Sequence, residues 1–425
     1  MKGKMMQDNI VANAPLITND AVVLGILTLI LGFVFYTSNS KNSVCQKFYK
    51  YVPALLMCYL LPSLLNTFGI VSAEVSKVDD VAKYFLLPAC LVLLTLSIDI
   101  KAIVGLGSKA LIMFITGTVG VVIGGPISLL IVSAIWPELI GVTGPEAVWR
   151  GMAALAGSWI GGGANMLAMK EIFEADGKIF TIMVTVDIVV ANLWMACLLY
   201  IAANHKAIDA KSGADTSGID KLIATVEANE REHKRTPELK DFMLIIAVAF
   251  GAAGFAHFLA DLLVPFFQLN YPELKKFSLH SKLFWIIVVV TTIGLTLSFT
   301  KVRQLEHAGA SKVGSSFLYI LVATIGLHMD ITQIAEAPKY VVIGLIWMAI
   351  HIILLFIVGR MIKAPIFYLA VGSKANIGGA ASAPVIASAF HPSLAPVGVL
   401  LAVLGYALGT YMAWICGQLL RIIGS

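Results

Sequence analysis

The chain has 425 residues, of which 59% are hydrophobic and only 13% are charged. A soluble domain carries about 25% charged residues, so this composition excludes an ordinary soluble protein and predicts an all-α, polytopic membrane protein. The formal net charge of +5 is small and spread over loops, so no nucleic-acid partner is expected.

Apolar runs recur along the whole chain. A bilayer-spanning helix needs about 17–25 mostly apolar residues. We therefore predict about twelve spans (roughly 11–13), at 18–37, 52–70, 83–98, 106–136, 149–173, 179–203, 241–268, 282–300, 315–329, 339–360, 364–390 and 394–420. No small-residue cleavage site follows the first run, which predicts a retained span rather than a signal peptide.

A charged segment separates the first six runs from the last six. The sequence predicts a first transmembrane half at 1–203, a polar linker at 204–240 and a second half at 241–425. The halves have matching parts: Asp99 and Asp330 each close a run, and a glycine-rich segment follows one run later. Such aspartates ordinarily cap a helix or face the headgroups.

The first glycine-rich segment lies inside the run at 149–173 and reads GSWIGGGAN from Gly157 to Asn165. Each glycine costs about 1 kcal/mol in a helix interior, so three in a row predict a break. A break in the bilayer frees backbone N–H and C=O groups, and it persists only where protein buries it or it lines a wet cavity. The freed groups can hold ions.

The second glycine-rich segment lies inside the run at 364–390 and reads GSKANIGGAASAP from Gly372 to Pro384. The alternative interpretation of either segment is close packing of small residues between helices. Two copies in corresponding positions favour a pair of broken helices that cross at a transporter binding site.

The spacing of the two segments raises a question of topology. In a count of twelve they lie six spans apart, which makes the repeats parallel, whereas inverted repeats need an odd offset. Either one crossing is miscounted or the glycine segments are re-entrant.

Asp187 lies well inside the run at 179–203. A charge at the bilayer centre costs at least about 2.5–3.5 kcal/mol, so it usually faces a partner or a cavity. We predict that Asp187 binds a cation, with Na⁺ favoured, or carries a proton; the alternative is a protonated carboxyl bonded between helices. Thr185, Asn192 and Asn165 are predicted to supply further oxygens.

Lys374 lies within the second glycine segment. It could bind a solute carboxylate, pair with Asp187 when the ion site is empty, or sit in a wet vestibule. The predicted solute-binding residues come from both glycine segments. They are Ser158, Gly162, Gly163, Asn165, Ser373, Lys374, Asn376, Gly378, Gly379 and Ser382.

The remaining polar residues predict no enzyme. The sequence has no His-Glu-x-x-His zinc site, no phosphate-binding loop and no nucleophile elbow, and its five cysteines show no paired spacing. No cofactor is expected beyond a coupling ion. Lys170 and Glu171 are expected to snorkel, and the scattered His257, Asp261, His328 and His351 to be ordinary satisfied residues.

The segments GSWIGGGANMLA (157–168) and GSKANIGGAASAP (372–384) resemble the integral membrane family called domain of unknown function 819. That family is similar to the cation/proton antiporter and anion transporter superfamily, which includes bile-acid sodium symporters. The resemblance implies core and panel domains, two broken helices crossing in the core, inverted repeats and an elevator motion. It also implies an acidic residue in the helix after the first broken one, where Asp187 stands. Lys374 departs from the neutral polar residue expected there.

The sequence therefore predicts a secondary active transporter in the cell membrane. The expected activity is Na⁺-coupled symport of a small organic anion, such as an amino acid, short peptide or other carboxylate. The alternative is a cation/proton antiporter without an organic substrate. The expected partners are membrane lipid, the solute, and Na⁺ or H⁺. The sequence leaves open whether the protein forms a homodimer.

Overall fold

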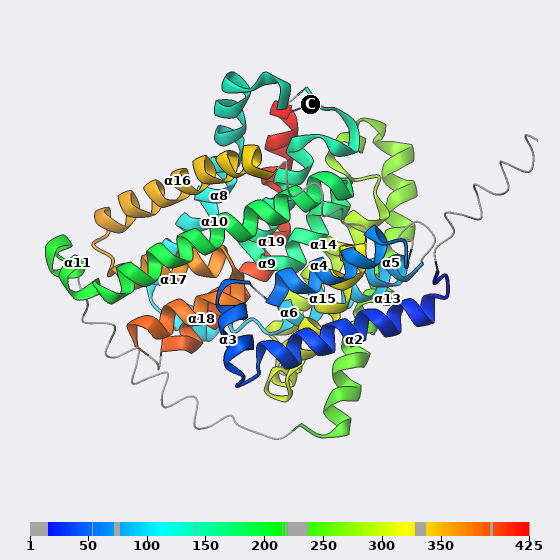
Figure 1. The fold of residues 1–425 in the computed structure, drawn as a ribbon, viewed down its shortest axis with the longest axis horizontal. Coiled ribbons are helices and arrows are strands. Elements are labelled where there is room, and N and C mark those ends of the chain that lie inside the picture. The colour runs from blue at the N-terminus through cyan, green and yellow to red at the C-terminus, as the bar shows by residue number, and fades with distance from the viewer. Residues whose placement is uncertain are drawn as a thin grey trace, which may run out of the picture. The chain divides into compact units, whose positions relative to one another are not determined.

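The structure is a computed structural model that describes residues 16–52, 54–71, 77–139, 141–214, 216, 219, 237–327, 337–391 and 394–424. Within these ranges every regular element is a helix (Figure 1), so the predicted all-α class is confirmed. Asp330, His328 and the linker residues 220–236 lie outside the described residues.

The helices follow the apolar runs of the sequence. The long ones are α2 (Asp20–Ser38), α8 (Ser108–Ile135), α9 (Val148–Ile172), α10 (Gly177–Ala203), α13 (Leu239–Asn270), α14 (Lys282–Ser298), α15 (Ala310–Leu327), α16 (Ala337–Met361) and α19 (Ala395–Gly424). The shorter ones are α3 (Ser43–Tyr51), α4 (Ala54–Thr67), α5 (Val78–Val81), α6 (Leu87–Leu96), α7 (Ile100–Gly105), α11 (His205–Ser212), α17 (Ile366–Asn376) and α18 (Gly379–Phe390).

Among the described residues, seven helices are long and apolar enough to cross a membrane, or up to nine if each of two bent pairs is one span. The chain is thus a multi-pass membrane protein, but the predicted twelve spans are not confirmed. Length is one reason: α17 has eleven residues and α18 twelve. A full crossing needs about 20.

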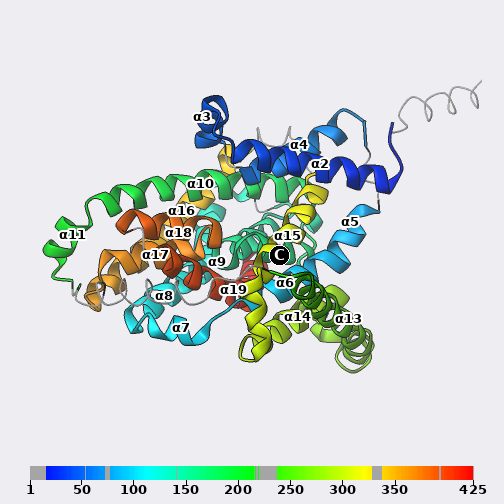
Figure 2. The ribbon, with the colours of Figure 1, turned by 90° about the horizontal axis from the view of Figure 1, so that it is seen from below.

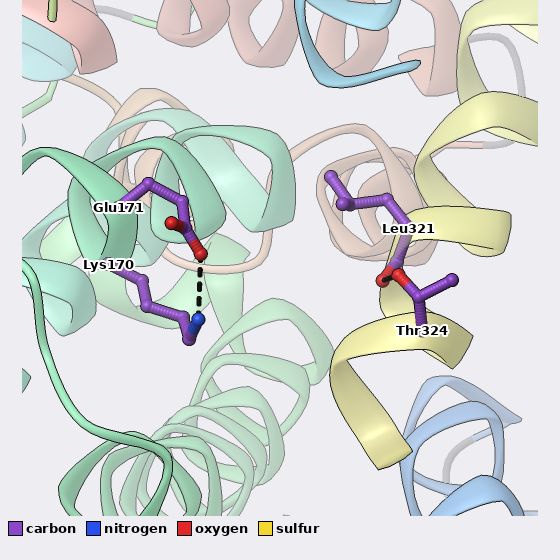
Figure 3. Close-up of polar contacts among 4 residues, drawn as sticks. All are labelled: Lys170, Glu171, Leu321 and Thr324. Carbon is purple, nitrogen blue, oxygen red and sulfur yellow. Dashed lines mark hydrogen bonds and ion pairs between the residues drawn. The ribbon is translucent and has the colours of Figure 1, made fainter. Parts of the chain in front are cut away.

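The chain forms two compact units, Met1–Leu87 with Ser316–Ala335 and Pro88–Ser315 with Glu336–Ser425. In the first unit, the rings of Phe35 and Tyr319 meet edge to face with centroids 4.7 Å apart. In the same unit the Thr324 hydroxyl donates to the Leu321 carbonyl over 2.8 Å, within its own helix (Figure 3). The second unit contains both glycine segments.

The helix α9 is a hairpin rather than a rod. Its backbone leaves helical geometry at Gly162, with φ 72° and ψ −172°. A straight helix would separate Trp149 from Phe173 by about 36 Å, yet their ring centroids are 5.9 Å apart. Near the tip, a Cβ on Gly157 would lie 2.4 Å from the Asn165 carbonyl oxygen, which places the two arms in contact.

The helices α17 and α18 form a second hairpin. The chain turns at Ile377 and Gly378, the latter with φ 110°. The ring centroids of Phe367 and Phe390, which lie at the two open ends, are 5.3 Å apart. A rod of that length would separate them by about 35 Å. The predicted breaks are therefore present, and both segments double back, which is the re-entrant alternative that the spacing left open; their count as full spans is not confirmed.

The two hairpins enter the second unit from opposite ends. The helix α10 has 27 residues and begins just after the open end of the first hairpin. Its far end lies at the open end of the second, where the rings of His205 and Phe390 are 5.3 Å apart. Both α17 and α18 lie beside α10 in the two views (Figures 1 and 2). The hairpin tips therefore meet near the middle of α10.

Cysteine labelling should confirm that both segments are re-entrant. In a background without the five native cysteines, Glu146→Cys and Glu174→Cys flank the first hairpin, and Arg360→Cys and His391→Cys flank the second. All four positions are exposed. A membrane-impermeant maleimide should reach both members of a pair from one side, and the two pairs from opposite sides. Labelling of Glu146→Cys and Glu174→Cys from opposite sides would instead show that this segment crosses the membrane.

Lys170 and Glu171, near the end of α9, form an ion pair rather than snorkelling. The Lys170 Nζ lies 2.7 Å from the Glu171 Oε1 (Figure 3). Their side chains are only 13% and 8% exposed. The expected snorkelling is therefore wrong, because each charge finds its partner in the adjacent residue and Lys170 also lies over the Phe180 ring.

Candidate functional site

The hairpin tips touch through glycines. A Cβ on Gly379 would lie 3.7 Å from the Gly162 Cα. Gly162, Gly378 and Gly379 all have positive φ, which side chains of L-residues rarely adopt. Each tip ends one helix and begins another, so carbonyl-bearing and amide-bearing helix ends gather at this point.

Asp187 on α10 binds the first hairpin just before its tip. Its Oδ2 accepts from the Ser158 hydroxyl over 2.6 Å, and its Oδ1 accepts from the Trp159 indole nitrogen over 2.8 Å. The Trp159 ring packs on Trp347 of α16 with centroids 5.0 Å apart. The carboxylate therefore faces the tips rather than lipid.

Lys374 brings a positive charge from the second hairpin to the same part of α10. Its side chain is buried, and its Nζ donates to the Ala191 carbonyl over 3.0 Å. Ala191 lies one helical turn after Asp187, and the charges of Asp187 and Lys374 interact electrostatically. Opposite charges from two helices, α10 and α17, thus converge where the tips meet.

Ser382, in the first turns of α18, has a buried hydroxyl oxygen for which the described residues offer no hydrogen-bond partner. A Cβ on Gly378 would lie 2.2 Å from that oxygen and 3.3 Å from the Lys374 Nζ. The hydroxyl and the ammonium therefore border the same small space beside the α18 N-terminus. A hydroxyl, an ammonium and the positive end of a helix suit an anion.

Asn165 holds the first hairpin against α19. Its Nδ2 donates to the Gly161 carbonyl over 3.1 Å and to the Tyr406 carbonyl over 2.9 Å, and its Oδ1 accepts from the Thr410 hydroxyl over 2.8 Å. The amide is fully buried. It bridges the break at Gly162, because Gly161 precedes the break and Asn165 follows it.

Asn376 holds the second hairpin against α8 with the same set of bonds. Its Nδ2 donates to the carbonyls of Gly372 and Phe114, over 3.0 and 2.9 Å. Its Oδ1 accepts from the Thr118 hydroxyl over 2.8 Å. We call each of these two sets of asparagine hydrogen bonds an asparagine bracket. In both, the threonine whose hydroxyl donates lies four residues after the residue on the neighbouring helix whose carbonyl accepts. Both asparagines, predicted as ligands, thus have their amides engaged in fixing the hairpins.

Ser373 lies in a polar chain behind the second tip. Its oxygen accepts from the Trp194 indole nitrogen over 2.8 Å and lies 2.8 Å from the His351 Nε2. The His351 Nδ1 lies 3.0 Å from the Gly117 carbonyl, which can only accept. The proton therefore belongs on Nδ1, Ser373 donates to Nε2, and a neutral imidazole satisfies every bond.

Thr185 and Asn192, the other residues predicted to supply oxygen atoms to a cation at Asp187, form hydrogen bonds within their own helix. The Thr185 hydroxyl donates to the Thr181 carbonyl over 3.0 Å, one turn back in its own helix. The Asn192 amide donates to the Ile188 carbonyl over 2.7 Å, and its side chain is exposed. Gly163 follows the first tip and is half-buried.

The sequence interpretation missed several residues that complete the site. They are Trp159, Trp194, Thr118, Thr410 and Tyr406, together with His351, which was expected to be an ordinary core residue. Their common signal is a polar atom inside an apolar run, which must find a partner away from water. The partners lie far away in the chain, so spacing could not identify them.

Asp99 has the capping role expected of it. As the N-cap of α7 it accepts from the Ala102 amide over 3.0 Å, and it pairs with Arg303 at 2.8 Å. Among the described residues no group of three His, Cys, Asp or Glu side chains could hold a metal ion. The hydrogen-bond partners found for Asp187 are the Ser158 hydroxyl and the Trp159 indole nitrogen.

Comparison with known proteins places the chain in a family. Residues 25–423 match the family described as protein of unknown function (DUF819). The chain is 23% identical over 365 residues to the uncharacterized membrane protein YjcL of Bacillus subtilis (strain 168), covering 82% of this chain and 85% of that protein. Because the family match extends over nearly the whole sequence, the chain belongs to the DUF819 family of membrane proteins.

Proposed function

We propose that the protein is a secondary active transporter that couples a cation to the symport of a small organic anion. The favoured coupling cation is Na⁺, and H⁺ is the alternative. The observation that carries the proposal is the place of Asp187 on α10, one turn from the Ala191 carbonyl that binds the buried Lys374, beside two touching hairpin tips. Interrupted helices at membrane depth persist where their free backbone groups line a cavity, and transporter sites are built from such helices.

Charge balance gives a simple coupling rule. With the site empty, Lys374 offsets the charge of Asp187. A cation bound at Asp187, with the Ser158 oxygen beside it, frees Lys374 to hold the carboxylate of a solute next to Ser382 and the α18 N-terminus. Both the empty and the fully loaded site are then close to neutral, whereas a half-loaded site carries an uncompensated charge that is costly in the bilayer.

The re-entrant hairpins also support inverted repeats. If neither hairpin crosses, the twelve apolar runs include ten crossings, and matching runs lie five crossings apart. An odd offset inverts the second repeat, and hairpins that enter from opposite ends are what inversion produces. We propose that the hairpins move with α8, α10, α16 and α19 as one elevator-like body, because the two asparagine brackets and the Ser373 chain tie these helices together.

Purified protein in proteoliposomes tests the symport. An inward Na⁺ gradient should drive saturable uptake of a labelled carboxylate, chosen from a thermal-shift screen of amino acids, short peptides and other carboxylates with and without Na⁺. An uptake rate that depends on neither the Na⁺ gradient nor the proton gradient would contradict the proposal. The cell membrane is the expected location, and no enzymatic activity is proposed.

The second candidate is a cation/proton antiporter without an organic substrate. The contact of Lys374 with the Ala191 carbonyl, one turn from Asp187, favours it, because a buried lysine could release its proton when a cation neutralises Asp187. Antiport would appear as Na⁺-driven alkalinisation or acidification of liposomes without any solute. Symport predicts that this pH change is absent until the carboxylate is added.

A further inference from the structure

A second polar pocket lies at the open end of the first hairpin, far along α9 from the tip. Its volume is about 290 Å³. The two ends of α9 form one wall, the turn before α14 forms another, and the last turns of α19 close it. The charged residues, the histidine and the serines in its lining are Arg150, Glu174, Lys275, Ser278, His280, Ser281 and Arg421.

The charges in this pocket are unbalanced. Among the described residues that line it, three cations, Arg150, Lys275 and Arg421, face one carboxylate, Glu174, which leaves +2 without counting His280. Glu174 is 79% exposed and lies 3.8 Å from the Arg150 guanidinium, so solvent screens much of its attraction. Arg150 and Arg421 also repel each other. Like charges gathered in one pocket cost free energy unless an anion joins them.

The arginine donors are only partly used. The Arg150 Nη1 donates to the Phe173 carbonyl, but its Nε is buried and has no hydrogen-bond partner in the described part of the chain. The Arg421 guanidinium lies over the Phe277 ring, with its carbon 5.9 Å from the centroid. An arginine has five N–H donors, so both residues keep donors for an acceptor within the pocket. Ser281 caps α14 at the rim, and its position adds the positive end of that helix.

We propose that this pocket binds a phosphate group, either of a free phosphate or of an anionic phospholipid headgroup. Phosphate oxygens match paired guanidinium groups in geometry and charge. The volume holds a phosphate with a few further atoms. The bound group links α9, α14 and α19 at the end of the first hairpin, independently of the solute at the tips.

The test compares wild-type protein with Arg421→Gln, because Arg150 also holds the Phe173 carbonyl and its loss would disturb the fold. Thermal stability of the full chain in detergent is titrated with inorganic phosphate, with chloride added to hold ionic strength constant. A parallel arm titrates phosphatidylglycerol against zwitterionic phosphatidylcholine. The matched control is Arg360→Gln, an exposed arginine at the end of α16.

Saturable stabilisation is expected in one arm, with affinity about tenfold weaker in Arg421→Gln and unchanged in Arg360→Gln. Stabilisation by inorganic phosphate identifies a free anion as ligand, and stabilisation by phosphatidylglycerol alone identifies a lipid headgroup. The proposal is overturned if neither ligand gives a saturable shift, or if Arg421→Gln binds as tightly as the wild type. Neither result depends on transport, so the proposed function stands or falls separately.

Discussion

Asp187→Asn is expected to abolish Na⁺-induced stabilisation while the protein still folds. The asparagine oxygen can still accept from the Trp159 indole nitrogen, and its amide nitrogen can donate to the Ser158 oxygen, so both contacts that bind the carboxylate at 2.8 and 2.6 Å are kept. It lacks the charge that attracts a cation, so cation affinity should fall about 10–100-fold, the value of a hydrogen bond or contact to a charged group. Thermal shifts in NaCl against choline chloride at equal ionic strength measure this, and uptake in proteoliposomes should fall with them.

The substitution also leaves Lys374 buried without its counter-charge. Breaking a buried pair by removing one partner can cost about 3–5 kcal/mol. The double variant Asp187→Asn/Lys374→Met removes both charges and should recover stability without recovering the response to Na⁺. Asp261→Asn is the matched control: Asp261 pairs with Lys282 at 2.6 Å but is 61% exposed, so its loss should leave Na⁺ stabilisation unchanged. Wild-type Na⁺ dependence in Asp187→Asn would refute the assignment of the cation site.

The sequence predicted the breaks but not the path of the chain on either side of them. Glycine clusters report that a helix cannot continue, because they lower its stability wherever they occur. They do not report the turn angle, which depends on one backbone conformation at Gly162 and another at Gly378. The even spacing of the two segments was the only sign in the sequence that they re-enter rather than cross.

The same limit applies to the site. Asp187 and Lys374 could be singled out because a charge inside an apolar run needs a reason. Asn165 and Asn376 were singled out as well, and the structure engages their amides with α19 and α8. An asparagine in a glycine segment can either bind a solute or hold the break together, and only its distant neighbours, Thr410 and Thr118, distinguish these roles.

Gly405→Ala in α19 is expected to disturb the first hairpin tip. A Cβ at Gly405 would lie 2.6 Å from the Ile160 carbonyl oxygen and 3.7 Å from the Gly161 Cα. Both neighbours are backbone, so no flexible side chain can give way, and the tip or α19 must shift. Overpacking of this kind costs about 1–3 kcal/mol.

The matched control is Gly251→Ala in α13. Apart from the adjacent backbone of its own helix, no atom of the described residues lies within 4 Å of a Cβ at Gly251, so the same substitution meets open space and adds up to about 1 kcal/mol of helix propensity. Thermal melting in detergent should therefore fall in Gly405→Ala and hold or rise in Gly251→Ala. In Gly405→Ala the rate of transport should fall by up to about 100-fold, because a displacement of about 1 Å at a site can cost that much. This loss is larger than the fall in thermal stability alone would cause. If the two alanine variants showed the same changes in melting temperature and transport, the close approach of α19 to the tip would not be what positions the hairpin.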